Sequence, residues 1–409
     1  MVSARDLRMI RADLEDAVAG VRLKDSDEDS VDFFATLAWN VICEPGDGFA
    51  GQLIETFGPA AALKFEIDRI SAEKYVQQFA DAGSDFAEMQ AFGAFEKNLI
   101  DARERWSARL SIQKVREAAT KMSMLDAWFI TRESQHWPGQ LEDLGRHAPR
   151  GLWGIGAPNT VKQTAISIVG SRMASSYGEY ATGELVGPLT RHGYSIVSGG
   201  AYGIDAMAHR AALALDGVTI SVMAGGLDRL YPSGNRDLLR AISDSGALIS
   251  EMPPGAEPTK WRFLQRNRLI AGLGLATIVV EANPKSGAIS TANRAIELER
   301  PLGAVPGPLN SPGSDGCHKL IRESQATLVT CGEDILELIG RGERWQGDEL
   351  PGLGALETRV NDVIGFGGAN LAKICAEAGL TRSEAQIGLA GLSLLGLIEE
   401  GPAGWHRKQ

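Results

Sequence analysis

Cysteine is scarce in this sequence, and the four cysteines are scattered along it: Cys43, Cys317, Cys331 and Cys375. Zinc sites and disulfide frameworks need closely spaced cysteines, so neither is indicated. Long apolar runs are missing too, because charged residues interrupt every apolar stretch well before the roughly 18 residues that span a membrane. The N-terminus shows no signal-peptide pattern. We therefore expect a cytoplasmic protein without a metal site or membrane segment.

The common fingerprints of nucleotide-dependent enzymes are also absent. No Gly-x-Gly-x-x-Gly follows the first predicted strand, and no Gly-x-x-x-x-Gly-Lys-Ser/Thr loop occurs. The Gly-x-Ser-x-Gly elbow of serine hydrolases is missing. Glu251 and Glu281 would form an acid/base pair only if the fold brought them together. The sequence thus predicts no cofactor and no catalytic residue, and we expect a protein that is not an enzyme.

Acidic side chains outnumber basic ones, but unevenly. The 409 residues carry a formal net charge of -11, and most of the excess acid lies in residues 1 to 150. The middle of the chain is nearly neutral, so a local basic patch can act there without an opposing field. The length predicts about two to four domains.

The pattern of apolar residues divides the chain into five segments. Residues 1–30 are acidic and predict a frayed lead-in. Apolar residues at helical spacing predict an all-helical domain over 31–150, and a change of period predicts a different domain over 151–340. Glycines and charges over 341–354 indicate a linker, and a further domain follows over 355–409.

Residues 46–51, Gly-Asp-Gly-Phe-Ala-Gly, predict a turn between two helices of the first domain. Such a turn could grip a nucleic-acid backbone as a helix-hairpin-helix, or simply connect the helices. We favour the simple connection.

Short apolar runs alternate with helix-length amphipathic stretches after Ala165. Nearly continuous apolar strands separated by helices are typical of a parallel sheet covered on both faces. The pattern therefore predicts an α/β domain of the doubly wound, Rossmann-like class. The predicted strands cover 166–169, 195–197, 219–223, 247–249, 277–280 and 302–305.

Small residues gather where these strands end. The first strand runs into Gly170-Ser171-Arg172, the second into the loop from Ser198 through Gly199, Gly200 and Tyr202, and the fifth into Ser286-Gly287. The carboxyl ends of parallel strands share one edge of the sheet, where glycine amides and helix N-termini favour anions. We expect an anion site there.

A basic run, Lys-Trp-Arg-Phe-Leu-Gln-Arg-Asn-Arg, covers residues 260–268. No acidic residue occurs between Pro258 and Val280. Arginines with interleaved aromatics are typical of surfaces that hold single-stranded nucleic acid. The alternative is a solvated helix face with Trp261 and Phe263 in the core.

Two weaker patterns have structural alternatives that we favour. Asp205 and His209 are four residues apart on a predicted helix, so they could bind a metal, but a helix cap and a packed histidine explain them as well. In the last segment, Thr381 and Glu384 form a capping box within a winged-helix outline. Its presumed recognition helix has only Arg382 as a cation, which disfavours duplex reading.

Taken in order, the motifs of residues 151–340 resemble the DNA-processing protein A (DprA/Smf) family. The resemblance rests on segments that occur in the order seen in that family. They are Ile168–Arg172 with Tyr177-Gly178, Ile196–Asp205, Gly226–Asp228, Ser250–Pro253, Arg266–Leu273, Val280–Ala282, Ser286-Gly287 and Val305–Gly307.

The resemblance implies a protein that binds and protects incoming single-stranded DNA and loads the RecA recombinase during natural transformation. It implies an extended Rossmann-like fold, a homodimer, a helical SAM or helix-hairpin-helix-like N-terminal domain and a C-terminal winged helix. By position in the motifs, the DNA-binding residues would be Gly170, Ser171, Arg172, Ser198, Gly199, Gly200, Tyr202, Lys260, Arg266, Asn267, Arg268, Ser286 and Gly287.

The sequence departs from the family pattern at one predicted contact, because Tyr202 stands where a Lys or Arg is common. This removes a cation and adds a surface that can stack on a base. The alternative function is a nucleotide-phosphate hydrolase or nucleotide sensor of related architecture, with Glu251 or Glu281 as acid/base.

Overall fold

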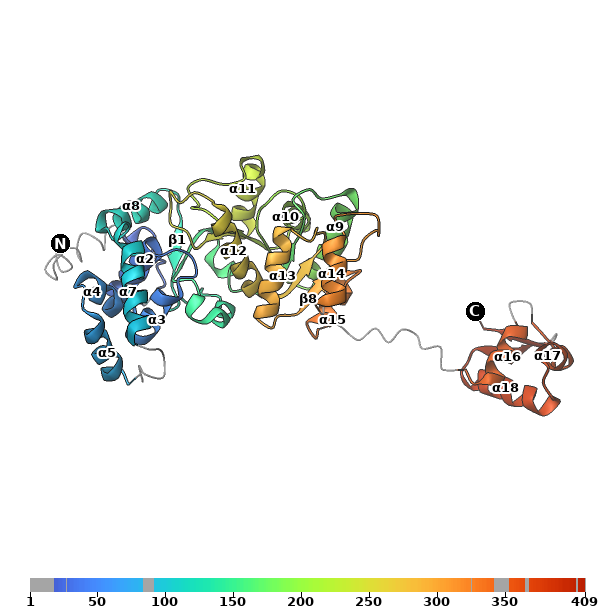
Figure 1. Ribbon diagram of the computed structural model, residues 1–409. Coiled ribbons are helices and arrows are strands. Elements are labelled where there is room, and N and C mark those ends of the chain that lie inside the picture. The colour runs from blue at the N-terminus through green and yellow to red at the C-terminus, as the bar shows by residue number, and fades with distance from the viewer. Residues whose placement is uncertain are drawn as a thin grey trace. The chain divides into compact units, whose positions relative to one another are not determined.

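The computed structural model describes residues 18–26, 28–83, 92–324, 326–341, 353–364, 368–401 and 404–408. The chain forms two compact units, residues 1–342 and 343–409. The division falls inside the segment that the sequence predicts as a linker, and most of that segment lies outside the described residues. Figure 1 shows the elements along the chain.

The first part of the larger unit is a cluster of helices around an aromatic core. Trp39, Tyr75 and Trp106 are almost completely buried there, and the Trp39 and Trp106 rings meet edge to face at 5.2 Å. Such pairs add to the stabilisation that burial itself provides. The helices are α2 (Ser30–Ile42), α3 (Gly48–Phe57), α4 (Pro59–Ile67), α5 (Ala72–Asp81), α7 (Phe92–Ser107) and α8 (Ile112–Ser123).

Two predictions for this part need correction. Val18 and Val21 are buried in the same core, so part of the acidic lead-in is packed; residues 1–17 and 27 lie outside the described residues. The helical domain also ends before residue 150, because Trp128–Ile130 form strand β1 of the sheet. Three residues are too few to show an alternating pattern, so no strand is predicted there.

Within the described residues the larger unit contains a nine-stranded sheet with the order β1-β2-β6-β5-β4-β3-β7-β8-β9. Strands β6 to β9 in that order pair in parallel, while β1 and β2 form an antiparallel edge. The chain leaves β3 first towards β4 and later resumes at β7 on the other side, so a topological switch point lies at β3. The strands are β1 (Trp128–Ile130), β2 (Leu152–Gly156), β3 (Ala165–Val169), β4 (Ser195–Ser198), β5 (Thr219–Met223), β6 (Ala247–Ser250), β7 (Gly274–Val279), β8 (Leu302–Ala304) and β9 (Thr327–Leu328).

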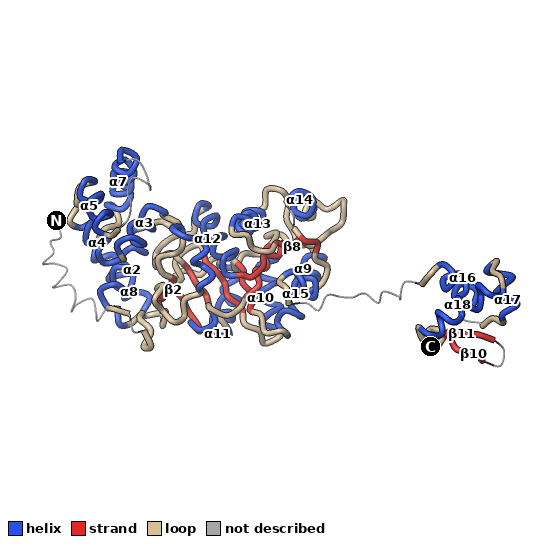
Figure 2. The backbone as a smooth tube through the Cα atoms, turned by 90° about the horizontal axis from the view of Figure 1, so that it is seen from below, coloured by secondary structure: helices blue, strands red, loops and turns tan. Residues whose placement is uncertain are grey.

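Helices cover both faces of the sheet, as the doubly wound pattern predicts. Figure 2 shows α12, α13 and α14 on one face and α9, α10, α11 and α15 on the other. Buried residues of the strands pack against both layers. One apolar cluster contains the helix residues Ile270 and Ala292, and another contains the helix residues Leu185 and Ala208. The helices are α9 (Ser176–Arg191), α10 (Ile204–Ala214), α11 (Arg236–Ser245), α12 (Lys260–Leu273), α13 (Gly287–Glu297), α14 (Asp315–Glu323) and α15 (Gly332–Leu338), and the 3-10 turns are η1 (Gly139–His147), η2 (Pro158–Thr160) and η3 (Ser233–Asn235).

The smaller unit contains α16 (Ala355–Ile364), α17 (Leu371–Ala378) and α18 (Arg382–Leu394), followed by a hairpin of β10 (Ile398–Gly401) and β11 (Gly404–Arg407). The predicted capping box is present, since the Thr381 hydroxyl accepts from the Glu384 amide and the Glu384 carboxylate accepts from Thr381. This order of elements agrees with the winged-helix outline, which stays a prediction. Among the described residues, no helix of either unit is both long and apolar enough to cross a membrane.

Candidate nucleic-acid interface

A cavity of about 620 Å³ lies at the switch point of the sheet. Its walls come from the loops after β3, β4 and β7 and from one face of α12. Eight of the thirteen predicted contact residues line it: Gly170, Ser171, Arg172, Lys260, Arg266, Asn267, Ser286 and Gly287. Two more, Gly199 and Tyr202, line an adjacent cleft.

Helix α12 brings the basic run to the cavity with one face only. Thr259 caps the helix by accepting from the Arg262 amide. Lys260, Phe263, Arg266 and Asn267 then line the cavity, because residues three and four apart share a helix face. Lys260 and Arg266 of the basic run line the cavity, whereas Arg262 and Arg268 do not.

Arg266 forms the floor of the cavity and is the most constrained cation in it. Its Nη1 donates to the carbonyls of Gly199 at 2.7 Å and Val222 at 2.5 Å. Only 6% of its surface is exposed, and this burial lowers the pKa of Arg266 to about 10, with Arg172 contributing and Asp205 opposing. Its buried Nε has no hydrogen-bond partner among the described residues. The guanidinium is therefore charged and incompletely satisfied.

Asp205, in the first turn of α10, holds the strand-end loops together at this floor. The backbone amides of Ala201, Gly170 and Gly199 favour its charged form, as does Arg266, whereas burial raises its pKa and outweighs them. The preceding Gly203 has a φ of 75°, and a Cβ there would lie 2.1 Å from the Ser171 carbonyl oxygen. Only glycine fits that close approach.

Arg172 and Phe263 separate the cavity from the adjacent cleft, since both line the two hollows. The Arg172 guanidinium lies 5.2 Å from the centre of the Phe263 ring, and that of Arg266 lies 5.9 Å from it. These are cation–π distances. Phe263 is therefore a half-buried wall of the site and not part of the core.

The N-terminus of α13 supplies the opposite wall. Ser286 caps this eleven-residue helix by accepting from the Ala288 amide at 3.2 Å, and the Asn267 side chain donates to the Gly287 carbonyl at 3.3 Å. A helix N-terminus carries a partial positive charge and favours anions. Lys285 stands exposed beside it.

Two cations of the basic run bind carboxylates instead of facing the cavity. Arg262 forms a double hydrogen bond with Glu44, at 3.1 and 2.7 Å. Arg268 is 4% exposed, and its Nη2 lies 2.7 Å from both carboxylate oxygens of Glu251. Glu44 is distant in the sequence, and Glu251 lies 17 residues before Arg268, so both are outside the acid-free stretch and its lack of acid was misleading. The predicted contact of Arg268 with DNA does not agree with this position.

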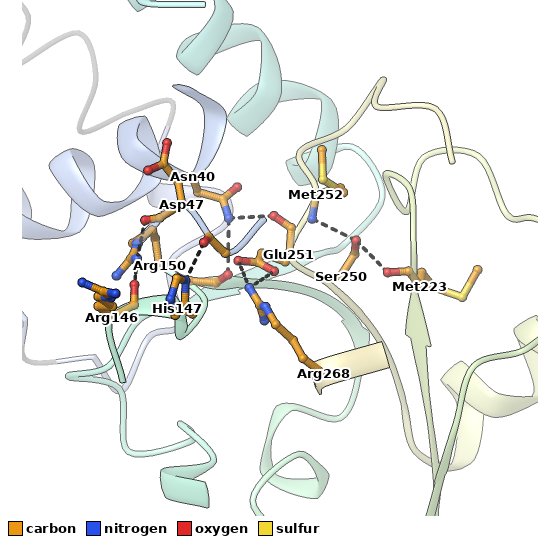
Figure 3. A network of polar contacts seen from close by, with 12 residues as sticks. Asn40, Asp47, Arg146, His147, Arg150, Met223, Ser250, Glu251, Met252 and Arg268 are labelled. Atoms are coloured by element: carbon orange, nitrogen blue, oxygen red, sulfur yellow. Dashed lines mark hydrogen bonds and ion pairs between the residues drawn. The ribbon is translucent and has the colours of Figure 1, made fainter. Parts of the chain in front are cut away.

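Figure 3 shows the surroundings of Arg268, where the helical part meets the sheet. The Asn40 amide donates to the Glu251 carbonyl at 2.8 Å, and Arg150 donates to the Asp47 carbonyl at 3.0 Å. A Cβ on Gly51 would lie 2.0 Å from the Arg146 carbonyl oxygen. The glycine turn of residues 46–51 is thus packed against this junction, which agrees with a helix connection.

Two further predicted contacts are buried at the end of β4 and in the loop that follows it. The Ser198 hydroxyl is fully buried and donates to the Ile168 carbonyl at 2.6 Å. Gly200 has a φ of 67°, with the Ser221 hydroxyl 2.6 Å from where a Cβ would be. Both residues shape the loop, and neither lines the cavity or the cleft.

The carboxylates of the alternative enzymatic function lie away from the cavity. Glu251 is paired with Arg268, and Glu281 accepts from the backbone amide of Ser175 at 3.0 Å. His209 is fully buried, with its Nδ1 2.6 Å from the Thr219 hydroxyl; burial first, and then Arg266, lowers its pKa to about 3. This agrees with a packed histidine.

Sequence reasoning missed several residues of the cavity. Lys285 directly precedes the predicted Ser286-Gly287 pair, so its position was a usable signal. Asn283 and Thr291 also line the wall near α13. Phe263 stood inside the basic run, but the sequence alone could not show which way its ring points.

Comparisons with known proteins agree with this geometry. Residues 128–340 match the family described as DNA recombination-mediator protein A. A DNA processing protein DprA of Mycobacterium tuberculosis is 42% identical over 318 residues, which cover 73% of this chain and 82% of that protein. Protein Smf of Escherichia coli is 39% identical over 220 residues, or 54% of this chain and 58% of its own length.

The X-ray structure of DNA processing protein A from Streptococcus pneumoniae superposes with a TM-score of 0.57 at 29% identity, covering 76% of this chain and 98% of that one. The likeness in sequence and the likeness in fold thus extend over most of the chain. This chain belongs to the DNA-processing protein A (DprA/Smf) family.

Proposed function

We propose that the cavity binds the sugar-phosphate backbone of single-stranded DNA, and that the protein mediates recombination in the cytoplasm without being an enzyme. The observation that carries this is the set of cations around the cavity. Arg172, Lys260 and Lys285 form no ion pair with any carboxylate among the described residues, and the floor adds the buried Arg266. Membership of a family described as recombination mediators supports the same function.

Single strands fit this site better than duplex does. The cavity is lined by three loops and by α12, and we expect a strand that enters it to bend and unstack its nucleotides. A single strand does so readily, whereas a duplex must first be opened. Cations for the phosphates and an aromatic wall at Phe263 are the two components of such sites.

A salt titration tests the proposal. If Arg172, Lys260, Arg266 and Lys285 each neutralise a phosphate, the log-log slope of affinity against salt should be roughly -3, from about -0.7 per phosphate on single strands. Arg172→Ala should weaken binding to every sequence and reduce the slope by about 0.7. Arg191→Ala, an exposed arginine of α9 outside the cavity, is the matched control. A slope near zero would contradict the proposal.

The nucleotide-hydrolase alternative loses support because its two carboxylates do not line the cavity. A thermal-shift comparison separates the two functions. We expect an oligonucleotide of about 20 nucleotides to raise the melting temperature, because DNA that binds only the folded protein stabilises it. Stabilisation by nucleoside monophosphates alone would favour the alternative.

We further propose that the protein acts as a homodimer that protects incoming DNA and loads RecA recombinase. The family description as a DNA recombination mediator supports the role in recombination. Wild type should accelerate RecA assembly on DNA covered by single-strand-binding protein, and Arg172→Ala should not. Equal assembly with both would show that RecA loading does not use this cavity. Light scattering of the purified chain measures its oligomeric state.

A further inference from the structure

A second, much smaller cleft of about 40 Å³ lies beside the cavity. It shares Arg172, Ala201 and Phe263 with the cavity, so the two hollows adjoin at the Arg172–Phe263 wall. The cleft continues over Tyr202 and Tyr231. A strand that follows the cavity past Arg172 would enter this cleft next.

Two tyrosine rings stand exposed in the cleft. Tyr202 is 48% exposed and Tyr231 is 49% exposed, and the Tyr231 ring lies 5.9 Å from that of Phe263 at an angle of 55°. Large aromatics gathered on a surface mark a binding site more often than chance exposure does. We call Tyr202, Tyr231 and Phe263 the aromatic shelf.

The shelf is held in place by contacts between neighbouring loops. The Tyr202 hydroxyl accepts from the Gly234 amide at 3.3 Å. The buried Asn235 side chain donates to the carbonyls of Gly200 and Ala201, at 3.0 and 3.1 Å. These contacts join the loop after β4 to the turn η3, directly after Tyr231 and Pro232. Rings fixed in this way lose little conformational entropy on binding.

Positive charge borders the shelf on both sides. Arg172 lies at the cavity side, and Arg229 lines the cleft at the other. Arg229 is paired with Glu257 at 3.2 Å, but both side chains are about three-quarters exposed (76% and 74%). Solvent screens such a pair, so it holds Arg229 only weakly and leaves it available to a phosphate.

We propose that the aromatic shelf stacks the bases of the nucleotides that follow those held in the cavity, with Arg229 contacting the next phosphate. The inference rests on the proposed single-stranded DNA function and adds a second subsite to it. The occupant is DNA and not a protein segment because the shelf continues the cation-lined cavity. Stacking uses the flat face that every base has, so binding at the shelf should not depend on sequence.

Fluorescence anisotropy with single-stranded oligonucleotides tests the shelf. The double variant Tyr202→Ala/Tyr231→Ala should weaken binding at least about fivefold, from the stacking energy per base, with an unchanged salt slope because tyrosine is uncharged. Arg229→Ala should instead reduce the slope by about 0.7. Tyr202→Phe/Tyr231→Phe should keep most of the affinity, because it keeps both rings and loses only the hydrogen bond from the Gly234 amide to the Tyr202 hydroxyl.

Controls separate the shelf from the fold and from the cavity. Tyr180→Ala removes a tyrosine of α9 that is 66% exposed and lines neither hollow, so its affinity should not change. Melting temperatures identify any variant that fails to fold. Replacing intact DNA by an oligonucleotide with abasic sites should weaken binding to wild type as much as the double alanine variant weakens binding to intact DNA. Combining the variant with the abasic oligonucleotide should weaken binding no further.

The possible failures are distinguishable. If Arg172→Ala weakens binding while the alanine variant and abasic DNA bind normally, the shelf inference is wrong and the proposed function stands. The inference is equally wrong if the alanine variant binds DNA normally and loses only RecA loading, since the shelf would then contact protein. Wild type that binds no single-stranded DNA would overturn both.

Discussion

Arg266 and Arg268 are two residues apart in α12 and equally buried, yet their surroundings are opposite. Arg266 lines the cavity and donates to backbone carbonyls, whereas Arg268 does not line it and is bound to Glu251. The outer cations of the same helix differ in the same way, with Lys260 at the cavity and Arg262 on Glu44. A basic run therefore supplies two kinds of residue, one that can bind an anion and one that fixes the helix.

The largest expected effect is on stability, at the carboxylate-bound arginine. Arg268→Ala leaves Glu251 buried without its partner, and breaking a buried pair costs about 3–5 kcal/mol. Urea denaturation measures the loss. At equal concentrations of folded protein, the salt slope for DNA should match that of wild type. A normal stability with a reduced slope would place Arg268 at the DNA and remove the contrast between the two arginines.

His209 tests how far positive charge is excluded near Arg266. Its folded pKa, about 3, lies below its unfolded value of 6.5, so the unfolded chain takes up a proton that the native state refuses. Stability should therefore fall with decreasing pH between 6.5 and 3. From pH 7 to 5 the contribution is about 2 kcal/mol, and His209→Gln should lack that part of the decrease. An identical pH dependence in both proteins would show that native His209 is protonated.

Arg262 should show a smaller effect because its pair is partly open to solvent. Its side chain is 14% exposed and that of Glu44 is 34% exposed, so we expect Arg262→Ala to cost about 1 kcal/mol after allowing for screening. Arg229→Ala, which breaks an exposed pair, is the matched control and should leave stability unchanged. Chemical denaturation of both variants measures the two changes in the free energy of unfolding. Equal losses of stability would contradict the expected difference between the partly buried pair and the exposed pair.

The smallest effect on stability is expected at the rim cations. Lys260→Ala and Lys285→Ala should each leave the free energy of unfolding within about 0.5 kcal/mol of wild type, because neither lysine has a carboxylate partner among the described residues. The double variant should nevertheless reduce the salt slope for DNA by about 1.4. If the double variant lost stability and kept the salt slope of wild type, the two lysines would have a structural role and would not contact DNA.

The sequence predicts the architecture of the α/β part well because each buried parallel strand produces its own short apolar run. The six predicted strands coincide closely with β3 to β8. Strand β1 was not predicted, because three residues are too few to show a periodic pattern. Its partner β2 lies antiparallel to β6 at the edge of the sheet.

The site was predictable only in part. Strand-end glycines locate the edge of the sheet where anions bind, since that follows from topology alone. Which cations reach it depends on carboxylates outside the basic run, and neither Glu44 nor Glu251 is recognisable as a partner before the chain folds. Ser198 and Gly200 are similar cases, because their positions in the motif do not reveal that they are buried and do not line the cavity.

The division of α12 into a cavity face and an anchored face limits how this segment can change in length. Each residue advances an α-helix by about 100°, so one inserted residue between Phe263 and Arg266 would turn the guanidinium of Arg266 off the cavity floor. The same rotation would separate Arg268 from Glu251. The segment can accept substitutions at its exposed positions, but an insertion or deletion would disrupt ligand binding and anchoring together.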